Sequence, residues 1–331
     1  MMKIFLILFS SIILFTGCST KNRFEPENVA SSIEVSGKLD SKIVQTSRSG
    51  ANLEDGQAIT ITNGLEPFKI EAGYRIVGAN DEYICASSNG GLLKLYKNRE
   101  LVSEFSFSKN VASASANESF LAVLFVNNDI ALYSKDSKEL IFKQGGEDII
   151  AVDTRVAQPQ FLNDLILYAT LDGKIIILNS ETKKPIRSIV LSDQQYFNNI
   201  IYMKMYDNVL IAATGSTLYS LTDKESRKNI SVRDVSFGED GLYVATKEGE
   251  ILKLSRSLEE EGRLKFDFAH FLGMAVSDHL YLAEKQGYIV VVNKVFASHE
   301  IYDVSLNNSR FFASDKAFYF DDVYIDLSVK E

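Results

Sequence analysis

The sequence predicts an all-β fold, a β-propeller of eight four-stranded blades, with seven blades as the alternative. Three observations favour it. From about residue 32 to 328 the chain is a series of short runs rich in Val, Ile, Leu, Tyr and Phe, separated by Gly, Asn, Asp and Ser. Helical periodicity is almost absent from this region. One hairpin pattern recurs along it at a nearly constant interval, which is typical of a repeat architecture.

The repeated hairpin is clearest at residues 171–186, LDGKIIILNSETKKPI, where an Asp-Gly turn opens onto an apolar run. An apolar strand precedes the turn in each copy, and a more polar strand follows. Several copies have a further short strand in front. Four strands in fewer than about 45 residues make one propeller blade. Successive turn residues are 34 to 44 residues apart, and they are Gly56, Gly91, Asp129, Gly173, Gly215, Gly249, Gly287 and Asp322.

The last repeat lacks an outer strand, because the chain ends soon after Ser328. We therefore expect an N-terminal strand near residues 33–38 to complete the last blade and close the ring. Ring closure buries the faces of the sheets and protects their edges. The degenerate copy around Gly56 leaves seven blades as the alternative. A parallel β-helix is disfavoured, because its coils are shorter than this repeat.

The N-terminus, MMKIFLILFSSIILFTGCST, has the features of an exported protein. Residues 1–17 predict a secretory signal peptide: a lysine, a short apolar stretch, then small residues. The apolar stretch is too short for a membrane-spanning helix, which needs about 20 residues. Residues 14–18, LFTGC, resemble a bacterial lipobox, which implies that Cys18 is acylated, as by palmitate, and becomes the mature N-terminus. An ordinary signal peptide with a chance cysteine is the alternative.

Acylation would hold the protein on a membrane, because acyl chains add about 0.8 kcal/mol per buried CH₂. Ser19 resembles the outer-membrane sorting signal of diderm bacteria, so we expect a lipid-anchored protein on the outer membrane that faces the periplasm. Residues 18–31 are predicted to be the lipidated N-terminus and a polar tether, and residues 32–331 the propeller. The net charge of −9 and the lack of a Lys/Arg run disfavour nucleic acid as a partner.

The segment 164–189, DLILYATLDGKIIILNSETKKPIRSI, resembles the repeat of pyrroloquinoline-quinone-type propellers. Asn179 stands where that repeat has Asp, and residues 182–184 stand where it has Thr-Gly-Lys. Residues 151–179 resemble the BamB family of lipoproteins in Asp153-Thr154, Pro159 and the turn at 171–173. BamB proteins are accessory propellers of the outer-membrane β-barrel assembly machine. The resemblance implies a non-catalytic scaffold in outer-membrane protein assembly.

Motifs of catalysis are absent from the sequence, so we expect no enzyme, no cofactor and no metal. Quinone-dependent propeller enzymes commonly stack Trp on the cofactor, and the chain has no Trp. The three histidines are interpreted as solvated turn residues, although two of them flank a strand and could approach each other; they are His270, His279 and His299. Cys85 lies in an apolar run and is predicted to be a buried hydrophobe.

The loop at residues 145–160, GGEDIIAVDTRVAQPQ, is the best candidate for contact with a protein partner. The residues proposed to bind the partner are Asp153, Thr154, Arg155, Gln158 and Pro159. Alternatively, this loop only shapes a turn between blades. Two other functions stay open: a small ligand or cofactor in the axial channel, and a scaffold for another envelope machine. A polar, open channel would favour the ligand, and a channel plugged by side chains would exclude it.

Replacing Cys18 with Ser tests the lipid anchor. The variant cannot be acylated, so we expect it in the soluble fraction after cell fractionation, whereas the unchanged protein sediments with membranes. A Cys85→Ser variant is the matched control and should stay on the membrane. Retention of the Cys18→Ser variant in the membrane fraction would show that lipid does not anchor this protein.

Overall fold

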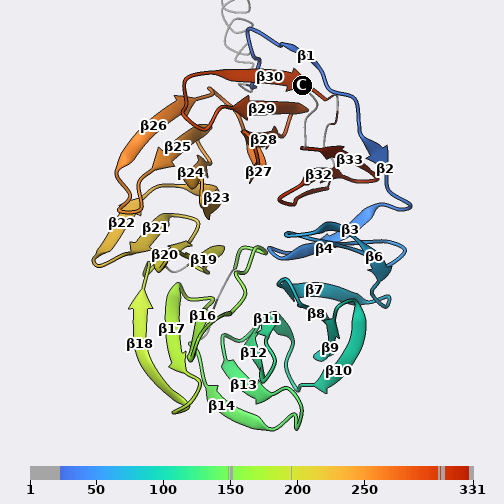
Figure 1. Ribbon diagram of the computed structural model, residues 1–331, viewed down its shortest axis with the longest axis vertical. Helices are drawn as coiled ribbons and strands as arrows, with labels where there is room; N and C mark the ends of the chain where they lie inside the picture. Colours follow the sequence, from blue (N-terminus) through green and yellow to red (C-terminus); the bar gives the residue numbers. More distant parts are fainter. Residues whose placement is uncertain are drawn as a thin grey trace, which may run out of the picture.

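The computed structural model is an all-β ring of eight blades around a central axis (Figure 1), which confirms the predicted fold class. It describes residues 23–327, except residues 148, 150, 151, 195, 305 and 307–309. Cys18 and the predicted signal peptide lie outside the described residues. No helix long and apolar enough to cross a membrane occurs in this part of the chain.

The first four blades follow one another along the chain, each with its strands in order from the axis to the rim. Blade 1 is β3 (Ile43–Thr46), β4 (Gly50–Leu53), β5 (Gln57–Thr60) and β6 (Gly64–Lys69). Blade 2 is β7 (Tyr74–Ala79), β8 (Tyr83–Ser88), β9 (Leu92–Lys97) and β10 (Glu100–Ser106). Blade 3 is β11 (Val111–Ala116), β12 (Phe120–Phe125), β13 (Ile130–Ser134) and β14 (Leu140–Gln144). Blade 4 is β15 (Gln160–Leu162), β16 (Leu165–Ala169), β17 (Lys174–Asn179) and β18 (Lys184–Val190).

The remaining blades continue the ring, and the last two include N-terminal strands. Blade 5 is β19 (Tyr202–Tyr206), β20 (Val209–Ala213), β21 (Thr217–Leu221) and β22 (Glu225–Asn229). Blade 6 is β23 (Val232–Gly238), β24 (Gly241–Thr246), β25 (Glu250–Leu254) and β26 (Glu260–Lys265). Blade 7 is β27 (Phe271–Val276), β28 (Leu280–Glu284), β29 (Tyr288–Val292), β30 (His299–Asp303) and β1 (Ser31–Ser32). Blade 8 is β31 (Phe311–Ala313), β32 (Ala317–Phe320), β33 (Val323–Asp326) and β2 (Gly37–Lys38).

The ring closes as the repeat count predicts. Gly37 and Lys38 of β2 pair antiparallel with Tyr324 and Val323 of β33, so the N-terminal strand is the outer strand of the last blade. The N–H of Ser36 also donates to the carbonyl of Tyr324, at 2.8 Å. Strands from near both ends of the chain therefore share the sheet of blade 8, and the short link from β2 to β3 joins this blade to blade 1.

The segment predicted to be a tether packs in part against the propeller. Phe24 is buried edge-on to Phe266 and Tyr288 in the core of blade 7, with ring centroids 6.2 and 5.6 Å apart. Downstream, β1 pairs parallel with β30. The folded body thus begins before residue 32, because Phe24 is buried against the propeller and the two residues of β1 pair with its outer strand β30.

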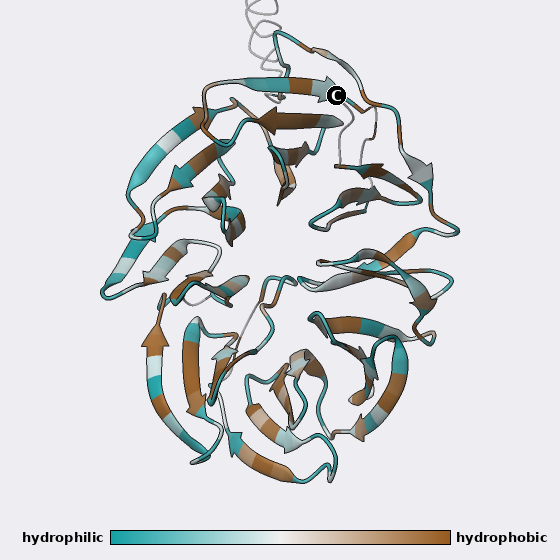
Figure 2. Cartoon of the chain, in the orientation of Figure 1, coloured by the Kyte–Doolittle hydropathy of each residue, from teal (hydrophilic) through white to brown (hydrophobic). Residues whose placement is uncertain are grey.

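Hydrophobic side chains concentrate on the second and third strands of each blade, which have neighbours on both faces. Figure 2 shows these strands largely brown, whereas the outer strands carry teal segments. β12, for example, is buried at every position but its first, and β26 is mostly exposed. Burial of this apolar area between blades is the main force that holds the ring together, at about 25 cal/mol per Å².

Gly78 on the inner strand β7 marks a close approach between blades 2 and 3. A Cβ added there would lie 1.7 Å from the backbone oxygen of Ala114. We expect Gly78→Ala to lower the free energy of unfolding by about 3 kcal/mol, because the backbone of β11 must shift to make room. Urea denaturation measures this loss.

The control is Gly90→Ala, at an open turn where the nearest atom would be 3.8 Å away. It should change the free energy of unfolding by no more than about 1 kcal/mol. Equal effects of the two substitutions would show that the contact between β7 and β11 is not tight.

Candidate functional site

The connection between blades 3 and 4 leaves the sheet and crosses the axial channel. β15 has only three residues, so the residues before it are free of the ladder of blade 4. The carbonyl of Ala157 accepts from Ser113 Oγ on blade 3, at 3.2 Å, and its N–H donates to the carbonyl of Ile200 before blade 5, at 2.9 Å. We call residues 152–160 the channel loop; Figure 1 shows it in green at the centre of the ring.

The Gln158 side chain attaches the channel loop to blades 1 and 2. Its side-chain nitrogen donates to the carbonyl of Ala79 at 2.8 Å, and its oxygen accepts from the N–H of the same residue at 2.8 Å. The oxygen also accepts from Ser49 Oγ at 2.7 Å. One side chain of blade 4 therefore meets the inner ends of blades 1 and 2, which holds the loop in the channel.

Arg155 and Asp153 form an ion pair inside the channel loop. The guanidinium donates to both carboxylate oxygens, at 3.0 and 2.6 Å, and also to the carbonyl of Arg233 on blade 6. Burial acts to raise the pKa of Asp153, but the hydrogen bonds and charge of Arg155 outweigh it and lower that pKa below its usual value. Both side chains are thus charged at neutral pH and are satisfied within the protein.

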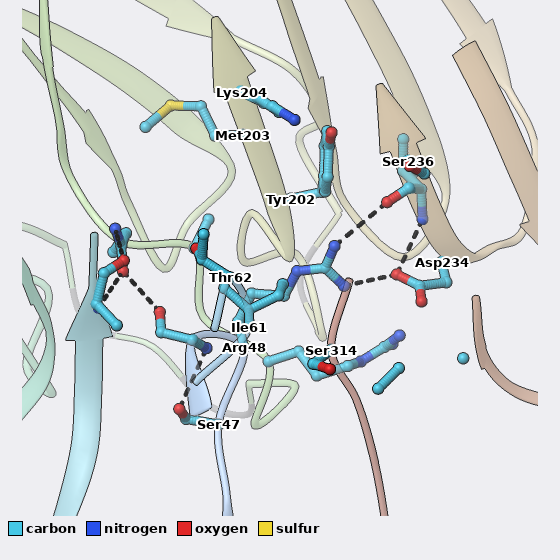
Figure 3. Close-up of a pocket in the computed structure, with 18 of the residues that line it drawn as sticks. Ser47, Arg48, Ile61, Thr62, Tyr202, Met203, Lys204, Asp234, Ser236 and Ser314 are labelled. Atoms are coloured by element: carbon cyan, nitrogen blue, oxygen red, sulfur yellow. Dashed lines mark hydrogen bonds and ion pairs between the residues drawn. The ribbon is translucent and has the colours of Figure 1, made fainter. Parts of the chain in front are cut away.

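Arg48 reaches across the ring to Asp234 (Figure 3). It lies in the turn between β3 and β4, and its guanidinium donates to the Asp234 carboxylate at 2.5 Å and to the carbonyl of Val235 at 3.2 Å. It also lies 5.0 Å from the ring centroid of Tyr202. Asp234 accepts in addition from the N–H of Met274, at 3.0 Å. This ion pair therefore joins blades 1, 5, 6 and 7.

A cavity of about 1140 Å³ remains around these groups. Its lining is mixed, with apolar residues such as Met203 and polar ones such as Lys204 and Ser314 (Figure 3). Asp315 also lines it, and burial raises the pKa of this carboxyl although the charges of Lys204 and Arg48 act to lower it. Side chains cross the channel but do not fill it. The alternative of a small ligand bound in the channel therefore stays open.

The structure brings all five predicted partner-binding residues into the lining of this cavity. Thr154 is exposed, Asp153, Arg155 and Gln158 are half-buried, and Pro159 is buried. Arg155 and Gln158 direct their side-chain polar groups to other blades, and Asp153 pairs with Arg155, so these three residues have an internal role. Contact with a partner remains a prediction for this loop.

Arg48, Tyr202 and Asp234 escaped the sequence analysis. They come from three different blades, and Arg48 and Asp234 are 186 positions apart in the chain. The Ser-Arg-Ser turn that carries Arg48 has no distinctive motif. An aspartate inside a predicted strand, as at Asp234, is the one signal that the sequence offers.

The histidines and Cys85 contribute no reactive cluster. His270 and His279 lie at opposite ends of β27, so the structure separates them; His279 is 3.2 Å from the carboxylate of Asp278. His299 packs edge-on against Phe266. Cys85 is buried as predicted, and burial raises the pKa of its thiol to about 12. Within the described residues, no three His, Cys, Asp or Glu side chains are grouped so that they could hold a metal.

Comparison with known proteins gives relatives in sequence and in fold. No protein-family model matches the chain. The plasminogen-binding protein PgbB of Helicobacter pylori strain J99 is 27% identical over 382 residues, which cover 98% of this chain and 70% of that protein. The protein of the same name from strain 26695 is also 27% identical, over 383 residues, with the same coverage.

Solved propellers share the fold at low identity. BamB from Moraxella catarrhalis superposes with a TM-score of 0.64 at 14% identity, over 87% of this chain and 99% of that one. The C-terminal WD40 domain of Sif2 gives a TM-score of 0.68 at 14% identity, over 91% and 100%. The resemblance to BamB is therefore confirmed for the fold, and identities of this size show the fold alone.

Breaking the Arg48–Asp234 pair tests whether the channel supports the ring. Arg48→Met leaves the buried Asp234 carboxylate without its cation, so we expect the free energy of unfolding to fall by about 3 kcal/mol, measured by urea denaturation. The variant with both Arg48→Met and Asp234→Asn should lose less than the sum of the single changes. Strictly additive losses would mean that the two side chains do not stabilise each other.

Proposed function

We propose that this protein is a lipid-anchored, non-catalytic propeller of the outer membrane that faces the periplasm, binds protein partners and assists the assembly of outer-membrane β-barrel proteins. The lipobox-like segment that ends at Cys18 supports the anchor. The eight-bladed fold, shared with BamB, supports the scaffold role.

The observation that carries the proposal is an exposed surface at the mouth of the channel. In a four-stranded antiparallel blade the chain leaves the outer strand at the end where the next inner strand begins, so all connections between blades lie on one face. Two such connections, at residues 145–159 and 191–201, meet over the channel. The N–H of Asp153 donates to Asn199 Oδ1 at 2.6 Å, and Asn199 Nδ2 donates to the carbonyl of Asp153 at 3.0 Å.

Phe197 stands out from this junction. Its side chain is 60% exposed, and its backbone has a φ of +50°, which a phenylalanine rarely adopts. The next residue, Asn198, is buried and donates to the carbonyls of Asp172 and Ser192, at 3.0 and 2.8 Å. Buried Asn198 and Asn199 thus hold the loop so that Phe197 faces outward.

An apolar surface of this kind favours a protein partner. We define the mouth surface as Val152, Thr154, Tyr196 and Phe197, of which the three apolar residues are exposed together with Thr154. Burial of a phenylalanine side chain by a partner would contribute about 1.5–3 kcal/mol, and such aromatic anchors are common at the centre of interfaces. The polar side chains of Asp153, Arg155 and Gln158 form hydrogen bonds within the channel, so they support the surface from inside and leave its apolar residues for a partner.

In-cell photocrosslinking tests this proposal. A photoreactive phenylalanine analogue at position 197 should crosslink to a subunit of the barrel-assembly machine. Phe268 is the matched control, because it is 51% exposed with a φ of +63° but lies outside the mouth surface, in the connection between blades 6 and 7. The same analogue at position 268 should give no crosslink to these subunits. We also expect Phe197→Asp to reduce the amount of outer-membrane barrel proteins while it changes the free energy of unfolding by no more than about 0.5 kcal/mol. If no subunit of the assembly machine is found among the crosslinks from position 197, the proposed partner is wrong.

A second candidate follows from the sequence relatives. Because the similar Helicobacter pylori protein is named for plasminogen binding, the alternative partner is an extracellular protein such as plasminogen. Purified plasminogen passed over the immobilised protein discriminates the two. Saturable binding that Phe197→Asp abolishes would favour this candidate, and the assembly role predicts none.

A further inference from the structure

The outer strands of the blades differ in how their free edges are protected. Exposed edge strands attract other strands, and proteins guard them with proline, charged side chains or a covering segment. β6 and β18 contain Pro67 and Pro185, and β30 is covered by β1. β10, β22 and β26 carry acidic residues among their exposed positions.

β14 of blade 3 is guarded by one charged side chain, Lys143, and by no covering strand among the described residues. Its sequence is Leu-Ile-Phe-Lys-Gln, with neither proline nor acid, and it is the terminal strand of its sheet among the described residues. Leu140 is 52% exposed at its start. β14 therefore presents a partly apolar edge that carries one lysine and no acidic residue.

A groove of about 560 Å³ runs beside β14, between blade 3 and β10 of blade 2. Aromatic side chains form its floor. The ring of Phe107 lies 5.9 Å from Phe105, 5.3 Å from Phe125 and 5.1 Å from Tyr133, measured between centroids. Phe107 and Tyr133 are only partly buried, so an apolar side chain that enters the groove would complete their packing.

The rim of the groove is basic. Lys109 and Lys143 both lie near the Asp129 carboxylate, at 2.6 and 3.4 Å, so two cations share one anion. Lys138 lies 5.8 Å from the ring centroid of Phe105. The remaining acid of the lining, Glu104, pairs with Lys94 at 3.4 Å. In a chain with a net charge of −9, this local excess of lysine selects for an acidic partner.

We propose that β14 and this groove bind an extended acidic segment of a partner protein. The segment adds to the free edge of β14 as a further strand, places an aromatic or aliphatic side chain on the aromatic floor, and directs carboxylates to Lys138 and Lys143. Main-chain hydrogen bonds would give affinity, and the pocket and lysines specificity. This inference rests on the protein-binding role proposed above and assigns a second surface to it.

Selection from a phage-displayed library of random short peptides tests the proposal with the purified protein. We expect enrichment of peptides that alternate acidic with aromatic or aliphatic residues. Leu140→Ser and Lys138→Glu should each weaken their binding about tenfold or more. Ile186→Ser is the matched control, because Ile186 is 58% exposed on the proline-guarded edge of β18, and it should leave binding unchanged.

A synthetic version of the best peptide, with alternate backbone nitrogens methylated, separates strand addition from side-chain contact alone. Methylation of the nitrogens that face β14 should abolish binding, whereas methylation of the others should not. Equal binding of both methylated forms, enrichment of basic peptides, or no enrichment at all would each overturn the proposal. These outcomes leave the crosslinks at position 197 unaffected, so the two proposals can fail separately.

Discussion

The pairing of β2 with β33 is the interaction on which the ring depends. A single four-stranded sheet cannot bury both of its faces, so each blade needs two neighbours. The pairing of Gly37 and Lys38 ties the first blade to the last, and the two blades also share an apolar core. Contacts across the axis support this closure. Arg48 links blade 1 to blade 6, and Gln158 links blade 4 to blades 1 and 2. The same groups that hold the ring thus occupy much of its channel.

The sequence predicts what is local and repeated. The turns at Gly91, Gly173 and Gly249 have positive φ values that glycine tolerates, so they mark the hairpins reliably. Closure by an N-terminal strand followed from the count of repeats. The docking of Phe24 could not be foreseen, since a single aromatic residue in a polar stretch gives no periodic signal. Nor could the Arg48–Asp234 pair, because only the closed ring brings such distant positions together.

The channel loop has an internal role that the sequence did not reveal. Sequence reasoning singled out residues 153–159 for a partner, and the structure places Arg155 and Gln158 in contact with other blades. The exposed residues of the neighbouring connection, above all Phe197, then depend on that internal anchoring. Propellers as different as BamB and the Sif2 WD40 domain share this fold, so the fold by itself does not specify a partner.

The docking of Phe24 on blade 7 has a consequence for how the ring is oriented. Phe24 is six positions after Cys18 in the sequence, and six residues of extended chain span at most about 20 Å. With the acylation proposed for Cys18, the site on blade 7 where Phe24 packs would lie within about this distance of the lipid surface. In a ring of eight blades, blade 3 is diametrically opposite blade 7 (Figure 1). The edge of β14 would then lie on the side of the ring opposite the point of attachment, where the lipid anchor leaves it accessible to a partner.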